Sequence, residues 1–231
     1  MATFLELAQK VGSESGTVDQ PILTVVGAKG RVGKVVRWTN DAYRQIQNAH
    51  AAWRWLQSDF TGPLAIGQQR HTPANLGINT RFAEYVCTGT GDEDRFSAYL
   101  TEGQGEGEYP MRFLPWDVFY TTRLRGKQVL GTPQFFSISP ANEIVVSPTP
   151  DRAFTLRGPY RKGPQELIAD GSTPEMPARF HDVIMDTALI MLTTHDEAAP
   201  TLPLYQLRKA RGWSDLARDQ LPIVGFAGAL A

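Results

Sequence analysis

Two histidine-containing clusters carry the side chains from which a metal site could be built. His181 and Asp182 lie close to Asp186, and a second cluster spans His195–Glu197. Asp182 and Asp186 are four residues apart and would share one face of a helix. Zinc and iron sites, however, use tighter ligand motifs, and the whole chain has four histidines. We therefore predict no metal and no cofactor.

Catalytic nucleophiles have equally little support in the sequence. The chain has no Gly-x-Ser-x-Gly elbow, and Cys87, its single cysteine, falls in a strand-like region without a marked base nearby. The acidic run Asp92–Asp94 lacks the ligand pattern of a calcium loop. Nothing in these motifs argues for catalysis, and we predict a non-enzymatic protein.

A glycine-rich stretch, Gly27–Lys34, resembles a phosphate-binding loop. It lies between an apolar run that could form a strand, Ile22–Val26, and a helical pattern. The spacing of such a loop requires a glycine where Ala28 stands and a serine or threonine where Val35 stands. We interpret the stretch instead as a tight turn followed by a basic helix start.

The composition is that of an ordinary soluble globular protein. Of 231 residues, 42% are hydrophobic and 20% are charged, and the net charge is −1. The basic clusters Lys29–Arg37 and Arg157–Lys162 lack a nucleic-acid reader motif, which leaves only non-specific contact with phosphate backbones open. Met1–Lys10 lacks the features of a signal peptide, and no apolar run reaches the length of a membrane span. We expect no membrane contact.

The N-terminal quarter of the chain is predicted to be helical. A capping box at Thr3–Glu6 predicts a short helix that stops at Gly12. In Val32–Gln57, apolar residues recur at steps of three and four, which predicts one long helix of roughly seven turns. Trp38 and Trp55 lie off this apolar stripe, which indicates that a second face of the helix is covered too.

The C-terminal quarter is predicted to be helical as well. Phe180–Leu192 repeats the three-and-four spacing and carries further apolar residues, which indicates a central helix. Leu204–Arg211 and Ser214–Gln220 are predicted as two shorter helices separated by Gly212. The uncharged Leu221–Ala231 has interior glycines that disfavour a helix, so it packs either in a groove of another subunit or against its own chain.

Between these regions the periodicity changes to that of strands. The turn Pro140–Glu143 predicts a hairpin, and Trp116–Tyr120 fits either a strand or a short helix. Seven runs rich in β-branched and aromatic residues are predicted as strands: Pro63–Ile66, Phe82–Val86, Phe96–Leu100, Met111–Leu114, Gln134–Ile138, Glu143–Val146 and Ala153–Arg157.

The resulting fold class is α+β. We predict a helical bundle built from both chain ends, residues 1–58 and 171–220, with an antiparallel β-sandwich or partial-barrel insertion between them. The insertion covers residues 59–170, and residues 221–231 form an apolar C-terminal tail.

Charge is distributed unevenly along this nearly neutral chain. Glu84–Tyr109 has seven acidic residues and one basic residue, whereas Lys29–Gln57 has six basic residues and one acidic residue. Within the acidic segment, the glycine-rich loop Glu102–Glu108 is expected to be mobile unless a partner orders it. The acidic segment of one copy could therefore attract the basic segment of a neighbouring copy. Either segment alone could equally be a solvent-exposed charged face.

Several segments, taken in order along the chain, carry a family resemblance. They are Phe4–Leu7, Val36–Gln47 with Trp53–Trp55, Gly131–Pro140, Val146–Asp151 and Thr173–His181. Together they resemble the head-to-tail adaptor (connector) proteins of tailed bacteriophages, which form a ring beneath the portal. Residues 200–231 depart most from the family pattern.

The resemblance implies a structural virion protein at the capsid–tail junction, made in the host cytoplasm and without enzymatic activity. It implies a homo-oligomeric ring, commonly dodecameric, that docks on the portal and presents a surface to the tail or to the next connector protein. The lumen of such a ring passes the DNA during genome ejection. We expect the portal and subunit interfaces to include Lys29, Arg31, Lys34, Arg37, Glu102, Glu106, Glu108, Arg208, Lys209, Trp213, Ile223, Val224, Phe226 and Leu230.

Two other functions compete with this hypothesis. A tail or baseplate module would bind a glycan or a protein ligand through the β-rich region, with Trp116, Phe119 and Tyr120 as the aromatic residues for a glycan. These three residues fit a core role better. A hydrolase acting on cell wall or nucleic acid is disfavoured because the sequence shows no catalytic motif.

Overall fold

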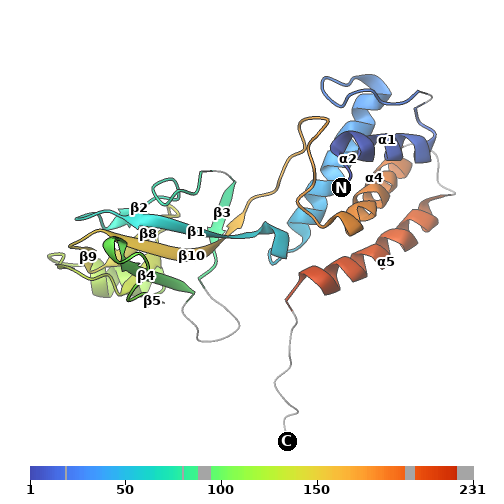
Figure 1. The fold of residues 1–231 in the computed structure, drawn as a ribbon. Helices are drawn as coiled ribbons and strands as arrows, with labels where there is room; N and C mark the ends of the chain where they lie inside the picture. The colour runs from blue at the N-terminus through green and yellow to red at the C-terminus, as the bar shows by residue number, and fades with distance from the viewer. Residues whose placement is uncertain (19, 80, 88–94, 196–200, 223–231) are drawn as a thin grey trace, which may run out of the picture. The chain divides into compact units, whose positions relative to one another are not determined.

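The computed structural model describes residues 1–231 except for residues 19, 80, 88–94, 196–200 and 223–231 (Figure 1). The chain divides into two units: Met1–Leu56 together with Pro164–Ala231, and Gln57–Gly163. The first unit contains the long helices, and the second contains the sheet. The α+β class expected from the sequence is therefore confirmed.

The helical unit is organised around α4, which contacts α1, α2 and α5. Its predicted stripe is buried except for the half-buried Met191. Met185 and Leu189 on its other sides are also buried, with 8% and 0% of their surfaces exposed. The helices of this unit are α1 (Phe4–Ser15), α2 (Gly30–Ala49), η1 (Arg54–Leu56), η4 (Ala178–Phe180), α4 (His181–His195) and α5 (Leu202–Gln220). None of the helices among the described residues is both long enough and apolar enough to cross a bilayer.

Helix α1 begins at the predicted capping box. The Thr3 hydroxyl accepts a hydrogen bond from the Glu6 amide at 3.2 Å, and the Glu6 carboxylate accepts one from the Thr3 amide at 2.9 Å. The predicted stop at Gly12 is wrong, because the helix continues to Ser15 and is capped by Gly16 in the left-handed conformation, with φ of 59°. Gly12 is instead a buried contact position of the helix.

Helix α2 is shorter than predicted, ending at Ala49 rather than Gln57. The Trp53 side chain folds back onto the helix, and its indole N–H donates a hydrogen bond to the Ile46 carbonyl at 2.9 Å. That carbonyl is one of the four that the last turn of a helix leaves without an intrahelical partner. Trp53 thus becomes fully buried without continuing the helix. Trp38 lies off the predicted apolar stripe of α2 and is 9% exposed. At this residue, the expectation that a second face of the helix is covered is confirmed.

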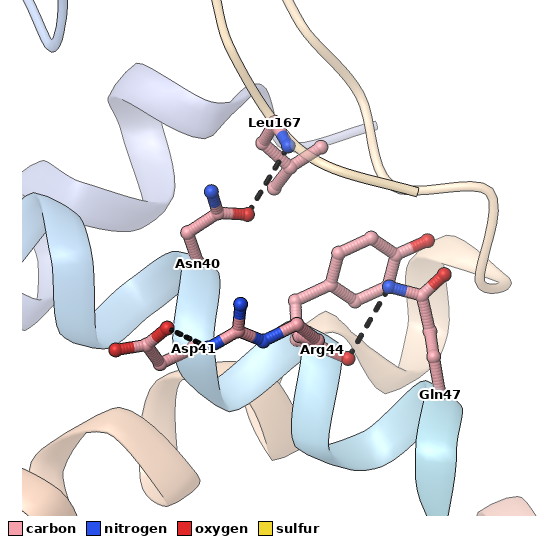
Figure 2. A network of polar contacts seen from close by, with 6 residues as sticks. Asn40, Asp41, Arg44, Gln47 and Leu167 are labelled. Atoms are coloured by element: carbon pink, nitrogen blue, oxygen red, sulfur yellow. Dashed lines mark hydrogen bonds and ion pairs between the residues drawn. The ribbon is translucent and has the colours of Figure 1, made fainter. Parts of the chain in front are cut away.

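Polar side chains of α2 fix the irregular segment that precedes α4 (Figure 2). The side-chain oxygen of Asn40 accepts a hydrogen bond from the Leu167 amide at 3.1 Å. The Gln47 side chain donates to the Gln165 carbonyl at 3.0 Å and accepts from the Gln165 amide at 2.7 Å. A segment without repetitive structure is therefore held in place because its backbone groups are satisfied by one helix.

The apolar run Ile22–Val26, which could have formed a strand, lies in an irregular loop. The predicted division of the last helix is wrong. Helix α5 runs unbroken from Leu202 to Gln220, so Gly212 does not separate two helices. A Cβ atom added to Gly212 would lie 2.8 Å from a methyl carbon of Val183 on α4. Glycine stands at this position because α5 packs closely against α4, a reason that local periodicity does not reveal.

The second unit is a barrel-like sheet with the strand order β1-β10-β4-β5-β7-β8-β2, in which β3 pairs with β10. The predicted hairpin is confirmed, because β7 and β8 pair antiparallel with Ile138 opposite Ile144. The strands of the unit are β1 (Gln57–Leu64), β2 (Arg70–His71), β3 (Phe82–Tyr85), β4 (Phe96–Leu100), β5 (Tyr109–Phe113), β6 (Leu130–Gly131), β7 (Phe135–Ile138), β8 (Ile144–Ser147), β9 (Thr149–Pro150) and β10 (Phe154–Lys162).

The strand pairing is not wholly antiparallel. Strands β5 and β7 pair in parallel, as do β6 and β9 in a separate two-stranded sheet. The connection from β5 to β7 contains the short helix α3 (Trp116–Phe119) and the π-helical turn η3 (Tyr120–Leu124), with a 3₁₀ turn η2 (Thr101–Gly103) earlier in the unit. Parallel pairing requires such a long crossover. Of the two alternatives for Trp116–Tyr120, the helical one is confirmed.

Candidate functional site

The first candidate surface is the N-terminal end of α2, where Lys29, Arg31, Lys34 and Arg37 are all exposed. We call these four residues the basic surface. Helix α2 has no acidic residue in its first turn and no side-chain cap, so the helix dipole adds to their positive charge. The predicted tight turn and basic helix start are confirmed.

Exposed apolar side chains accompany the basic surface. Leu23 and Val26, in the loop before α2, are 86% and 59% exposed. Asp170 fastens this loop by accepting a hydrogen bond from the Val25 amide at 2.7 Å, and Ile168 beside it is 76% exposed. Sequence reasoning did not single out these residues, because it considered the run Ile22–Val26 only as a possible strand. Apolar and positive groups side by side suit a protein partner.

The acidic loop Glu102–Glu108 is only partly available to a partner. Glu102 and Glu106 are exposed. Glu108 accepts a hydrogen bond from the Ser97 hydroxyl and forms an ion pair with Arg157 at 3.1 Å, both within the β-rich unit. Of the three glutamates predicted at an interface, Glu108 is therefore already engaged within its own unit.

The second basic cluster is engaged in the same way. Arg157 pairs with Glu108, and Arg161 on the same strand pairs with Glu84 on β3. Each arginine thus neutralises a carboxylate on a neighbouring strand or loop. The cluster Arg157–Lys162 is less suited to phosphate contact than the basic surface, where the charges are exposed.

Arg208 connects three helices rather than projecting toward a partner. Its guanidinium lies 3.1 Å from Glu14 of α1 and 3.1 Å from Asp186 of α4. Asp186 is buried, with 4% of its surface exposed. Burial raises the pKa of Asp186 to about 6, and the nearby Arg208 charge opposes this rise. Arg208 is therefore a structural cross-link inside the helical unit.

Lys209 and Trp213 lie on one side of α5 and line an apolar groove between α2, α4 and α5. The Trp213 ring centroid is 5.8 Å from that of Trp53 and 6.0 Å from that of His50. Trp213 is thus half-buried against the end of α2 and half-open to the groove. The other predicted interface residues, Ile223, Val224, Phe226 and Leu230, lie outside the described residues.

The metal candidates do not come together in the part of the chain that the structure describes, where no group of three potential ligands is found. The ring of His181 is buried against the Met176 carbonyl at 3.0 Å, and this burial lowers its pKa. The side chain of His195, residues 196–197 and the run Asp92–Asp94 lie outside the described residues.

The reactivity expected of Cys87 is low. It lies two residues beyond the end of β3 rather than within a strand. Burial, together with the Glu84 carboxylate, raises the pKa of the Cys87 thiol to about 12. A thiol with such a pKa supplies almost no thiolate at neutral pH and is a poor nucleophile.

The aromatic residues considered for a glycan do not share one open face. Phe119 is fully buried, Trp116 is half-buried and Tyr120 is 49% exposed. The Arg70 guanidinium lies 5.8 Å from the centre of the Trp116 ring. Two of the three rings therefore serve the packing of the β-rich unit, as the core role predicted.

Comparison with known proteins gives one finding that covers nearly the whole chain. A family model described as SU10 adaptor protein matches residues 2–227. A search of curated proteins found no match.

Proposed function

The chain belongs to the SU10 adaptor protein family, and from this premise we propose that it is a structural virion protein that joins a phage capsid to its tail. The single observation that carries this proposal is the family match, which extends over both units of the structure. The family also supports contacts with portal and tail components. The proposed role needs no catalytic centre.

The proposed assembly is a homo-oligomeric ring that is closed by repeated contacts between unlike surfaces of neighbouring copies. We propose twelve-fold symmetry as the family resemblance implies, docking on the portal at one end and on the tail or the next connector at the other. The lumen would pass the DNA during genome ejection, with only non-specific contact to its phosphates.

Within this ring, we propose that the predicted bundle (residues 1–58 and 171–220) and the predicted β-rich insertion (residues 59–170) act as two parts, with their boundaries moved to those of the two compact units, Met1–Leu56 with Pro164–Ala231 and Gln57–Gly163. The shared hydrophobic core supports the bundle, because Leu7 and Ile46 from the first segment are buried in the same cluster as Leu189 and Leu216 from the second. The insertion has its own core, which includes Phe60, Phe96 and Phe136.

Among the predicted interface residues, we propose that the exposed ones that form no ion pair with another described residue make the contacts. These are the basic surface, together with Glu102 and Glu106 of the acidic loop. The exposed Leu23 and Val26 would extend the basic surface with apolar area. Glu108 and Arg208 would contribute only indirectly, because their charges are satisfied within the chain.

The test is co-assembly with the portal protein of the same phage. Multi-angle light scattering of the purified chain, alone and mixed with assembled portal, should show a ring or a portal-bound ring of defined mass. Phage particles made without the protein should contain capsids and tails that do not join. A chain that stays monomeric and does not co-migrate with portal, while particles without it still join, would overturn the proposal.

A further inference from the structure

The helical unit has an apolar groove beside α5. Its volume is about 580 Å³, and it is bounded by α2, α4 and α5. Ile46 and Ala49 line it from the last turns of α2, and Ala210 and Trp213 line it from α5. Ile46 is buried and Ala210 is exposed, so the groove has an apolar floor and an open rim. Such a groove favours aliphatic side chains from a protein partner.

The same unit carries exposed aliphatic side chains on and beside the loop that precedes α2. Leu23, Val26 and Ile168 are 86%, 59% and 76% exposed, and we call these three residues the apolar patch. On the same loop, Ile22 and Val25 are buried in the core of the unit. The loop therefore anchors itself with two apolar side chains and presents two others to solvent.

Hydrogen bonds hold this loop in place. The Gln9 side chain donates to the Ile22 carbonyl at 2.7 Å. Asp170 accepts hydrogen bonds from the Val25 amide at 2.7 Å and from the Thr24 hydroxyl at 2.9 Å. A loop that is ordered before binding loses little conformational entropy when it binds, which suits the patch to a complementary groove.

The patch and the groove lie on opposite faces of α2. The segment that contains Ile168 is held by Asn40 and Gln47, which share one face of the helix because they are seven residues apart. Gln45 and Ala49, which line the groove, project from roughly the opposite face. Figure 1 shows α5 on the other side of α2 from this segment. One chain therefore cannot place its own patch in its own groove.

The two surfaces also differ in charge. The loop of the patch precedes the first turn of α2 and adjoins the basic surface, whereas the groove lies at the last turn, which has no basic residue. The negative end of the helix dipole therefore lies beside the groove. Among the described residues that line the groove, Lys209 is the charged one, and its ammonium group can extend into solvent from the rim. Charge thus favours contact between the first turn of one α2 and the last turn of another.

We propose that the apolar patch of one copy binds in the groove of the next copy. The partner is a second copy because every chain carries both surfaces and cannot join them by itself. Such contacts between unlike surfaces repeat from copy to copy and close into a ring when the rotation between copies permits. The inference rests on the proposed ring and identifies one of its subunit contacts.

Disulfide cross-linking of the full-length chain tests this contact in a Cys87→Ser background. One protein carries Leu23→Cys, and a second protein with a different tag carries Ala210→Cys. After assembly and oxidation, the two proteins should form a mixed dimer. Its yield should exceed that of Leu23→Cys with Asp215→Cys at least about tenfold, because only the contact holds two thiols together. Asp215 is exposed on α5 outside the groove, five residues beyond Ala210 and so about 140° around the helix axis.

Charge substitutions provide a second measurement. Val26→Glu and Ala210→Glu should each reduce ring formation in mass photometry at least about tenfold, because a carboxylate is costly to bury in an apolar groove. Ala141→Glu, the same change at an exposed turn of the β-rich unit, is the matched control and should leave ring formation unchanged. Circular dichroism should show that all three variants keep the native helix content.

The outcomes separate this inference from the proposed function. Rings that form without cross-linking between Leu23→Cys and Ala210→Cys would overturn the inference and leave the ring in place. If Ala210→Glu weakens binding to assembled portal while Val26→Glu changes neither binding nor ring formation, the groove binds the portal and the inference is wrong. A chain that forms no ring, alone or on the portal, would overturn the inference together with the proposed function.

Discussion

At the scale of single residues, Gly158 shows how closely the core of the β-rich unit is packed. A Cβ atom added to this residue of β10 would overlap the ring of Phe96 on the neighbouring strand. We predict that Gly158→Ala lowers the free energy of unfolding by about 2 kcal/mol, because overpacking forces the ring or a strand to move. Urea denaturation followed by circular dichroism measures the effect.

The matched control for this substitution is Gly171→Ala. No heavy atom lies within 4 Å of the Cβ position at Gly171, and its backbone does not require glycine. Its unfolding free energy should therefore change by less than about 0.5 kcal/mol. Equal stability losses at Gly158 and Gly171 would contradict the close contact with Phe96.

Asp186 is the residue whose charge should make the stability of the helical unit depend on pH. Its folded-state pKa is raised from 3.8 to about 6 by burial. The folded state therefore holds the proton more tightly than the unfolded chain, and Asp186 costs stability as the pH rises from about 4 to about 6. We predict that Asp186→Asn, which cannot ionise, becomes progressively more stable than the wild type across this window, by up to about 2 kcal/mol.

Chemical denaturation of Asp186→Asn and of the wild type at about pH 4, 5, 6 and 7 measures the difference in their unfolding free energies across this window. Asp41→Asn is the control, because the Asp41–Arg44 ion pair lies on the surface and contributes little at any of these pH values. A constant difference between Asp186→Asn and the wild type would show that Asp186 keeps its charge throughout.

At the scale of elements, the sequence predicted where helices and strands exist better than where they end. Periodicity located α2 and the strands because burial repeats every 3.6 or 2 residues. The end of α2 depends on Trp53 folding back to the Ile46 carbonyl, and periodicity continues through it. Gly212 similarly looked like a break, although its neighbour Val183 comes from another helix. Contacts between distant parts of the chain decide both cases.

The fold-back of Trp53 can be tested directly. Trp53→Phe keeps an aromatic ring but leaves the Ile46 carbonyl without its donor, so we predict a loss of about 1–3 kcal/mol in unfolding free energy. Trp55→Phe is the control, because the buried Trp55 indole N–H has no hydrogen-bond partner among the described residues and its ring stacks on Trp53. Urea denaturation should therefore give Trp53→Phe a clearly lower unfolding free energy than Trp55→Phe. The reverse order would refute the role of the indole hydrogen bond.

At the scale of the whole molecule, the sequence predicted the mixed class and the ordered family segments, but only part of the candidate interface. The charges at Lys34 and Glu102 are exposed, as their loop and helix-start positions suggested. Glu108 and Arg208 are engaged by partners far away in the sequence, Arg157 and Glu14. Residue type alone does not distinguish a charge that faces solvent from one that is paired inside its own chain.

The remaining exposed charges provide a test of the proposed ring. If the basic surface of one copy meets the acidic loop of the next, reversing either should weaken assembly, and reversing both in one chain should restore it. We predict that Arg31→Glu with Lys34→Glu, and separately Glu102→Lys with Glu106→Lys, reduce ring formation at least tenfold. The chain carrying all four changes should recover, because the attraction is re-formed with opposite signs.

Mass photometry at low and high salt measures this association, which should weaken as ionic strength screens the exposed charges. Arg44→Glu with Arg54→Glu is the matched control, since it makes the same change in net charge within α2 and η1 but away from the basic surface. Rings that form equally well from every variant would show that charge does not pair the copies. If the chain with all four substitutions still fails to form rings, the two surfaces contact different partners, and the portal or the tail binds one of them.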